Sequence, residues 1–141
     1  MSLPDATIDG RLLESARRHF LEKGFLNAQL KDICDDAGVT TGALYKRYRG
    51  KEEVFDALVA DTLREIEESI ARRADIDLRA VSDQALTGAW VNTYDGVMEW
   101  FSFCNARRDG FVLLVRCAAG TRYGNLLHDF CSHMTEIDYR W

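Results

Sequence analysis

The sequence predicts an all-α protein, in which an N-terminal three-helix domain is followed by a second helical domain. Apolar residues recur three and four positions apart along the 141-residue chain, which is the spacing of one face of an α-helix. Pro4 is the single proline, and the ten glycines stand apart from one another, so no flexible linker separates the two parts. We expect the domains to cover residues 1–50 and 51–141.

The first helix is expected over residues 7–23. Its apolar positions recur at helical spacing: Ile8, Leu12, Leu13, Ala16 and Phe20. Gly24 is expected to end this helix, and Phe25 to close the core beneath it.

Residues 24–51 contain the pattern of two short helices joined by a tight turn. The first inward stripe is Leu30, Ile33, Cys34 and Ala37, and the second is Val39, Leu44 and Tyr48. Gly38 stands between them, where a sharp reversal requires a left-handed backbone that glycine adopts at little cost. Thr40 can cap the second helix. This is a helix-turn-helix, and its second helix is the one expected to enter DNA.

The distribution of charge supports this expectation. Residues 1–51 have a net charge of +2, whereas residues 52–141 have −7, and the whole chain has −5. The run KRYRGK at residues 46–51 contains four cations and no acid. Lysine and arginine displace condensed counterions from duplex DNA, so a basic end on an acidic protein suits phosphate binding. A solvated charged face is the alternative for such a run.

A larger set of residues has coordinated spacing across residues 16–52: Ala16, Phe20, Gly24, Phe25, Ile33, Ala37, Gly38, Val39, Gly42, Leu44, Tyr45, Tyr48, Lys51 and Glu52. This set resembles the N-terminal domain of the TetR (tetracycline repressor) family of transcriptional regulators. The resemblance implies a homodimer that binds a palindromic operator in double-stranded DNA. It also implies a small-molecule effector that binds the C-terminal domain and releases the DNA.

The same resemblance implies roles for individual residues. The Tyr45 hydroxyl and Lys51 are expected to contact phosphates, because recognition helices and helix N-termini are placed in this way. The residues expected to face the major groove are Thr40, Thr41, Ala43 and Lys46.

Four positions depart from the family pattern or carry two interpretations. Ala28 and Gln29 stand where the family usually has Thr and Ser, so Ala28 cannot cap, Asn27 becomes a candidate cap, and Gln29 remains a candidate DNA contact. Arg47 replaces a common aromatic residue and is a further candidate phosphate contact. Gly42 either lets the helix approach DNA closely or packs closely against the partner helix.

The second domain is expected to start with a long connecting helix over residues 51–73, with acids at its start and arginines at its end. An aromatic-rich helix is expected over residues 81–105, a short one over 109–119, and a last one from near Tyr123. The apolar pattern of the last helix stops without a cap, which indicates that the native chain continues and that the helices of the family dimer are missing.

The aromatic residues of the second domain have two interpretations. They either form core or line an apolar effector cavity with a few polar groups. The candidate effector-binding residues are Trp90, Tyr94, Met98, Phe101, Phe111, Cys117 and Tyr123.

Other kinds of chemistry have little support in the sequence. His128 and Cys131 share a helix face, but a metal site needs three or four ligands, so no metal or cofactor is predicted. The four cysteines lack paired spacing and are expected to be buried thiols. The chain has no phosphate-binding glycine loop and no nucleophile elbow, so no catalytic residue is predicted.

No apolar run approaches the length needed to cross a bilayer, so we expect a cytoplasmic protein that does not associate with membranes. The alternative function is a helical small-molecule-binding or protein-interaction module that has lost operator binding. The altered Ala28–Gln29 cap would then reflect that loss.

Overall fold

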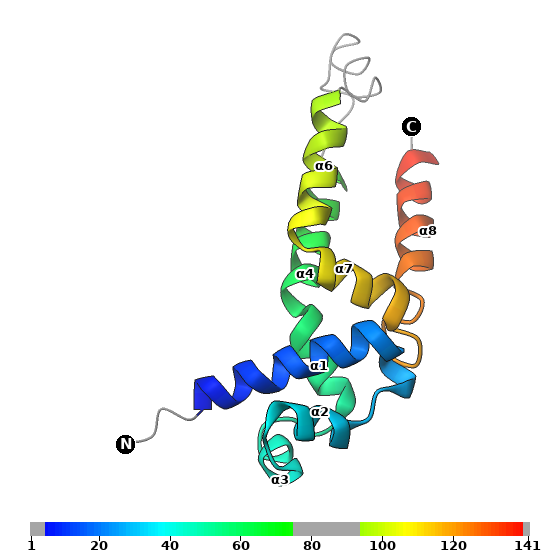
Figure 1. Ribbon diagram of the computed structural model, residues 1–141. Coiled ribbons are helices and arrows are strands. Elements are labelled where there is room, and N and C mark those ends of the chain that lie inside the picture. The colour runs from blue at the N-terminus through cyan, green and yellow to red at the C-terminus, as the bar shows by residue number, and fades with distance from the viewer. Residues whose placement is uncertain (1–4, 75–93, 140–141) are drawn as a thin grey trace.

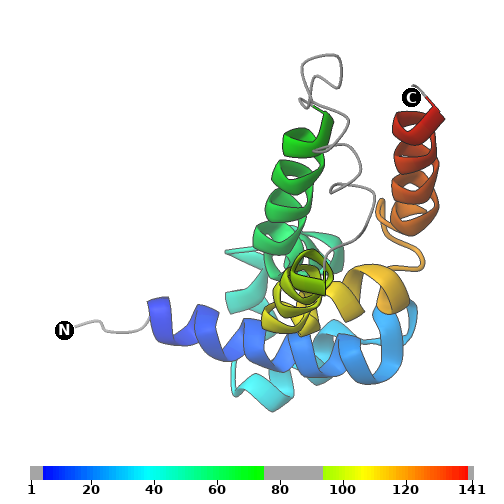
Figure 2. The same cartoon turned by 90° about the horizontal axis from the view of Figure 1, so that it is seen from above.

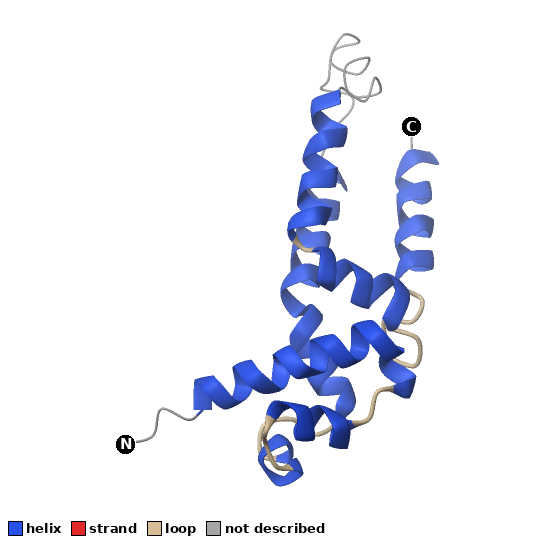
Figure 3. Ribbon diagram, in the orientation of Figure 1, coloured by secondary structure: helices blue, strands red, loops and turns tan. Residues whose placement is uncertain are grey.

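The computed structural model describes residues 5–74 and 94–139, and all the secondary structure within these ranges is helical (Figure 3). The elements are α1 (Asp5–Asn27), α2 (Leu30–Ala37), α3 (Thr41–Tyr45), α4 (Lys51–Ala74), α6 (Tyr94–Ala106), α7 (Arg108–Val112), the π-helical turn η2 (Leu113–Cys117) and α8 (Leu126–Tyr139). The all-α prediction is therefore confirmed. No described helix is long and apolar enough to span a membrane.

The first three helices gather at the N-terminal end of α4 (Figure 1). α1 packs against α2 and α4, and η2 covers the other side of α1. α7 packs against α4 and continues directly into η2, and α8 extends away from the three N-terminal helices in both views (Figure 1 and Figure 2). Residues 113–117, which form η2, are thus packed directly on the first helix of the chain.

α1 has a break near its end. Gly24 has φ 75° and ψ 165°, a backbone conformation that other residues rarely adopt, and a last turn then reaches Asn27. The prediction that Gly24 ends the first regular helix is confirmed. The break turns Phe25 into the core, where it is buried, and leaves Leu26 60% exposed.

The centre of the core is a cluster of aromatic rings. Phe55 from α4 lies 5.3 Å from Phe20, 5.5 Å from Phe25 and 6.3 Å from Tyr123, measured between ring centroids. The two closer pairs are edge-to-face, which is a favoured geometry for aromatic rings. Since Phe20 and Tyr123 come from opposite ends of the chain, the core is continuous across the predicted domain boundary at residue 50.

The C-terminal helices follow the predicted order with different bounds. The helix predicted over 109–119 forms α7 and η2, and the last helix begins at Leu126 rather than near Tyr123, because residues 118–125 form turns. Of the helix predicted over 81–105, residues 81–93 lie outside the described part of the chain.

The cysteine prediction is only partly right. Cys34 and Cys117 are buried, but Cys104 is half-buried and Cys131 is exposed. Cys131 is exposed because α8 packs against the core through Leu126 at its start, and Cys131 lies farther along the helix.

The aromatic cluster predicts a large loss of stability on truncation. Replacing Phe55, which is fully buried, with Ala should lower the free energy of unfolding by about 3–5 kcal/mol, because it leaves a cavity among three rings. Val115→Ala is the matched control, since Val115 is 47% exposed, and it should change that free energy by less than about 0.5 kcal/mol. Urea denaturation followed by circular dichroism measures both. Equal effects of the two substitutions would contradict this description of the core.

Candidate DNA-binding surface

The turn between α2 and α3 is fixed by backbone hydrogen bonds. Gly38 adopts φ 65° and ψ 37°, its N–H donates to the Asp35 carbonyl at 3.2 Å, and the Val39 N–H donates to the Cys34 carbonyl at 3.0 Å. This pair of bonds is the Schellman motif, which closes a helix on a left-handed residue. The predicted role of Gly38 is confirmed.

α2 is fixed to α1 by a buried serine. The Ser15 Oγ atom lies 2.9 Å from the Ile33 carbonyl oxygen and 2.6 Å from Asp36 Oδ2, and Ser15 is fully buried. The hydrogen bond from Ser15, followed by the charge of Arg18, lowers the pKa of Asp36. The Arg18 guanidinium is 2.8 Å from the same carboxylate. The orientation of α2 on α1 therefore depends on polar contacts as well as on apolar packing.

α3 presents one face to solvent and buries the other. The Thr40 hydroxyl accepts a hydrogen bond from the Ala43 N–H at 3.1 Å, which confirms the predicted cap. Leu44 is 1% exposed and anchors the helix in the core, whereas Tyr45 is 58% exposed. The other exposed residues of this face are Thr40, Thr41, Gly42 and Lys46, and Ala43 is half-buried.

The space around Gly42 decides between its two interpretations. A Cβ atom built at Gly42 would have a single neighbour within 4 Å, the Thr40 hydroxyl at 3.9 Å. The backbone therefore does not pack closely on the partner helix at this position, and that interpretation is wrong. The surface at Gly42 is open, so close approach to DNA remains the prediction.

The Arg47 side chain is mostly buried by its contacts with α1 and α3. Its Nε atom is 2.6 Å from Asp9 Oδ1 on α1, its Nη1 atom donates to the Ala43 carbonyl at 3.2 Å, and its side chain is 19% exposed. These contacts join the turn after α3 to the start of α1. A phosphate contact by Arg47 stays a prediction, and it would compete with Asp9.

Lys51 closes the break at the end of α1. Its ammonium group donates to the carbonyls of Leu26 at 3.2 Å and Ala28 at 3.0 Å, and it lies 4.6 Å from the centroid of the Phe25 ring. Burial lowers the pKa of Lys51. An ammonium has three N–H donors, so one remains for an external acceptor such as a phosphate.

The start of α2 has no side-chain cap. Gln29 occupies the cap position in an extended conformation without capping the helix, and its side chain is exposed. The prediction that Asn27 is a displaced cap is wrong, because its amide donates to the Lys23 carbonyl at 3.1 Å within α1. Neither residue therefore binds the free amides of α2, and a DNA contact by Gln29 stays a prediction.

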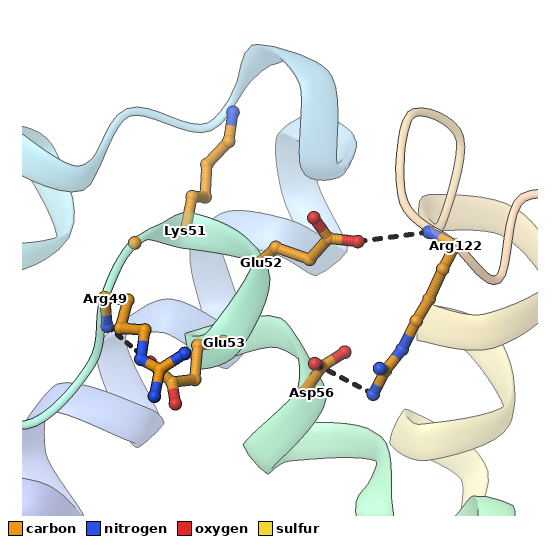
Figure 4. A pocket seen from close by; sticks show the side chains of 7 residues that line it. Arg49, Lys51, Glu52, Glu53, Asp56 and Arg122 are labelled. Carbon is orange, nitrogen blue, oxygen red and sulfur yellow. Dashed lines mark hydrogen bonds and ion pairs between the residues drawn. The ribbon is translucent and has the colours of Figure 1, made fainter.

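A pocket of mixed charge lies at the start of α4 (Figure 4). It is lined by Arg49, Gly50, Lys51, Glu52, Glu53, Asp56 and Arg122. The Glu53 carboxylate accepts a hydrogen bond from the Arg49 N–H and so holds the turn that leads into α4. The sequence gives no local signal for Arg122, because 70 residues separate it from its hydrogen-bond partner Glu52.

The candidate effector-binding residues do not form one described pocket. Met98 and Phe101 are 44% and 63% exposed, whereas Cys117 and Tyr123 are 7% and 9% exposed and belong to the core shared with α1 and α4. Phe111 is half-buried and packs edge-to-face on Phe103 at 5.7 Å. Trp90 and the Tyr94 side chain lie outside what the structure describes. Effector binding by these residues therefore stays a prediction.

The two threonines at the start of α3 allow a matched test of the cap. Thr40→Ala should lower the free energy of unfolding by about 1 kcal/mol, because the Ala43 N–H loses its partner. Thr41→Ala removes a similar exposed side chain next to the cap and should change that free energy by less than about 0.5 kcal/mol. Thermal and urea denaturation measure both variants. A Thr41 effect as large as that of Thr40 would contradict the assigned cap.

Comparison with known proteins identifies the helix-turn-helix region. Residues 12–58 match a family described as bacterial regulatory proteins, tetR family. The chain is 37% identical over 65 residues to the HTH-type transcriptional regulator TtgR of Pseudomonas putida, which covers 46% of this chain and 30% of that protein. It is 34% identical over 89 residues to the HTH-type transcriptional repressor KstR2 of Mycobacterium tuberculosis. This alignment covers 62% of this chain and 43% of that protein.

The HTH-type transcriptional regulator UidR of Escherichia coli is 36% identical over 62 residues, covering 44% of this chain and 30% of that protein. The aligned part of this chain thus spans less than half the length of each of these relatives.

Proposed function

Because this chain belongs to the TetR family through its N-terminal domain, we propose that it is a transcriptional regulator that binds duplex DNA through α3. The exposed face of α3 is the observation that carries the proposal. Leu44 anchors the helix, Gly38 and Thr40 fix its direction, and Thr41, Tyr45 and Lys46 remain exposed. Short, fixed helices with an exposed polar face can reach base edges in the major groove.

The proposed complex contains two copies of the chain on a palindromic operator. A recognition helix of five residues reads only a few base pairs, so a second copy in the next major groove, about 34 Å away, doubles the contact. Lys46 and the exposed Arg49 supply positive charge beside the helix. We infer a cytoplasmic location, because the proposed function requires access to chromosomal DNA.

A small apolar or aromatic effector is proposed to release the DNA, which makes the protein a repressor. α4 supports this part of the proposal, because it extends from Lys51, beside the recognition helix, into the C-terminal helices. α7 packs against α4, and Arg107 pairs with Glu65 near the middle of α4. An effector that binds one position of α4 more tightly than another would shift the two DNA-binding domains relative to one another.

The alternative function is a helical binding module without operator binding. The uncapped start of α2 is the one observation that favours it, since no side chain at residues 28 and 29 caps the free amides of that helix. DNA binding is the measurement that separates the two functions.

The direct experiment is fluorescence anisotropy with a labelled duplex from the region upstream of the gene, together with a scrambled duplex of equal length. The proposal predicts tighter binding to the upstream duplex, and a logarithm of the binding constant that falls linearly with the logarithm of salt concentration. Equal and weak binding to both duplexes at every salt concentration would favour the alternative function.

Tyr45 and Tyr48 provide a matched pair of hydroxyl deletions. Tyr45→Phe should weaken binding to all duplexes severalfold without changing the slope of affinity against salt, because the lost phosphate contact is uncharged. Tyr48→Phe is the control, since Tyr48 is half-buried against the core, and it should bind as the wild type does. Anisotropy titrations at several salt concentrations test the pair. The Tyr45 assignment is wrong if the two variants bind alike.

The contact between Asp9 and Arg47 predicts a substitution that tightens binding. Asp9→Asn removes the charge that competes with phosphate for Arg47, so the affinity for duplex should rise and the salt slope should steepen by about one counterion. Glu68→Gln changes the net charge equally at an exposed position far along α4 from α3 and serves as the control. Salt-dependent anisotropy distinguishes them. An unchanged slope in Asp9→Asn would show that Arg47 stays on the protein when DNA binds.

A further inference from the structure

The start of α4 presents a problem for phosphate binding. Its first turns carry three acids, Glu52, Glu53 and Asp56, beside the cations of Arg49 and Lys51. These two cations alone would leave this edge with a net negative charge, which repels a phosphate backbone. The third cation of the pocket is Arg122, and it comes from the turn before α8 (Figure 4).

Arg122 is fixed at this position by several contacts at once. Its backbone N–H donates to Glu52 Oε1 at 3.2 Å, and its Nη2 atom is 2.9 Å from Asp56 Oδ2 and 2.7 Å from the Tyr123 hydroxyl. The guanidinium also lies 4.9 Å from the centroid of the Tyr123 ring, which is buried beside Phe55. A long side chain is thereby held against α4, although 63% of it remains exposed.

The turn that carries Arg122 is itself attached to the N-terminal domain. Gly120 has φ 89°, and a Cβ atom built there would lie 2.3 Å from the Leu26 side chain. The turn therefore lies directly on the end of α1, the same segment whose carbonyls bind Lys51. The turn that carries Arg122 and the start of α4 therefore both contact the end of α1, and a movement of one would move the other.

We propose that Arg122 is a positioning residue for DNA binding, whose guanidinium neutralises Asp56 so that a phosphate can approach Arg49 and Lys51. The inference rests on the proposed function, since it concerns the same DNA surface. Arg122 does not itself contact the phosphate. It makes the affinity for DNA depend on whether the turn over residues 118–125 is docked on α4, and so gives the C-terminal part a direct electrostatic effect on the DNA surface.

The test uses the whole chain and a duplex from the upstream region, with anisotropy measured at several salt concentrations. Arg122→Ala should weaken binding about threefold to tenfold, as expected for an exposed charge next to a binding site, and should leave the salt slope unchanged. Arg122→Lys keeps the charge and should bind within about twofold of the wild type. Arg116→Ala, an exposed arginine of η2 outside the pocket, is the control of equal net charge and should bind as the wild type does.

A second substitution separates neutralisation from the other roles. Adding Asp56→Asn to Arg122→Ala removes the acid that had lost its partner, so it should restore most of the affinity. Circular dichroism establishes that each variant is folded at the assay temperature.

Three results would overturn the inference while leaving the proposed function in place. A salt slope that falls by about one in Arg122→Ala would make Arg122 a direct phosphate contact. An affinity that Asp56→Asn fails to restore would assign the loss to misplacement of the turn. Unchanged affinity in Arg122→Ala would show that the pocket charge has no effect. A wild-type chain that binds no duplex would overturn the proposed function as well, so the two failures are distinguishable.

Discussion

The packing of Phe55 is the constraint on which the rest of the structure depends. Its ring meets Phe20 and Phe25 of α1 and Tyr123 of the turn before α8, so one side chain joins three distant segments. Phe55 lies one turn into α4, which fixes the start of that helix against the end of α1. The recognition helix enters this arrangement through Leu44, which belongs to the same core.

The position of α4 brings its first charged residues into contact with the N-terminal domain. The break at Gly24 leaves the carbonyls of Leu26 and Ala28 available, and Lys51 binds both while lying over Phe25. On the other side of the same turn, Glu52 and Asp56 hold Arg122. The proposed DNA surface and the C-terminal part therefore both contact the start of α4, residues 51–56. A displacement of this segment would move both.

Local patterns predicted the features that depend on nearby residues. Gly38 and Thr40 were predictable because a helix end and a helix start have strict backbone requirements, and the buried stripes followed from helical spacing. The contacts of Arg47 with Asp9 and of Arg122 with Asp56 were not, because charged side chains carry no pattern that identifies a distant partner. The hydrogen bonds of Lys51 could not be predicted from the sequence for a similar reason. Its acceptors are the backbone carbonyls of Leu26 and Ala28, which the break at Gly24 leaves available. The candidate effector-binding residues pack in separate places or lie outside the described ranges. Helical spacing alone therefore could not predict which of them would line a common pocket.

Hydrogen exchange of the backbone amides with and without the upstream duplex shows which helices contact DNA. Added duplex should slow exchange in α3 and in the first turn of α4, around Thr41–Tyr45 and Lys51, and leave α8 unchanged. Slower exchange confined to α8 or α6, with no change around Tyr45 and Lys51, would place the DNA contact elsewhere and contradict this expectation.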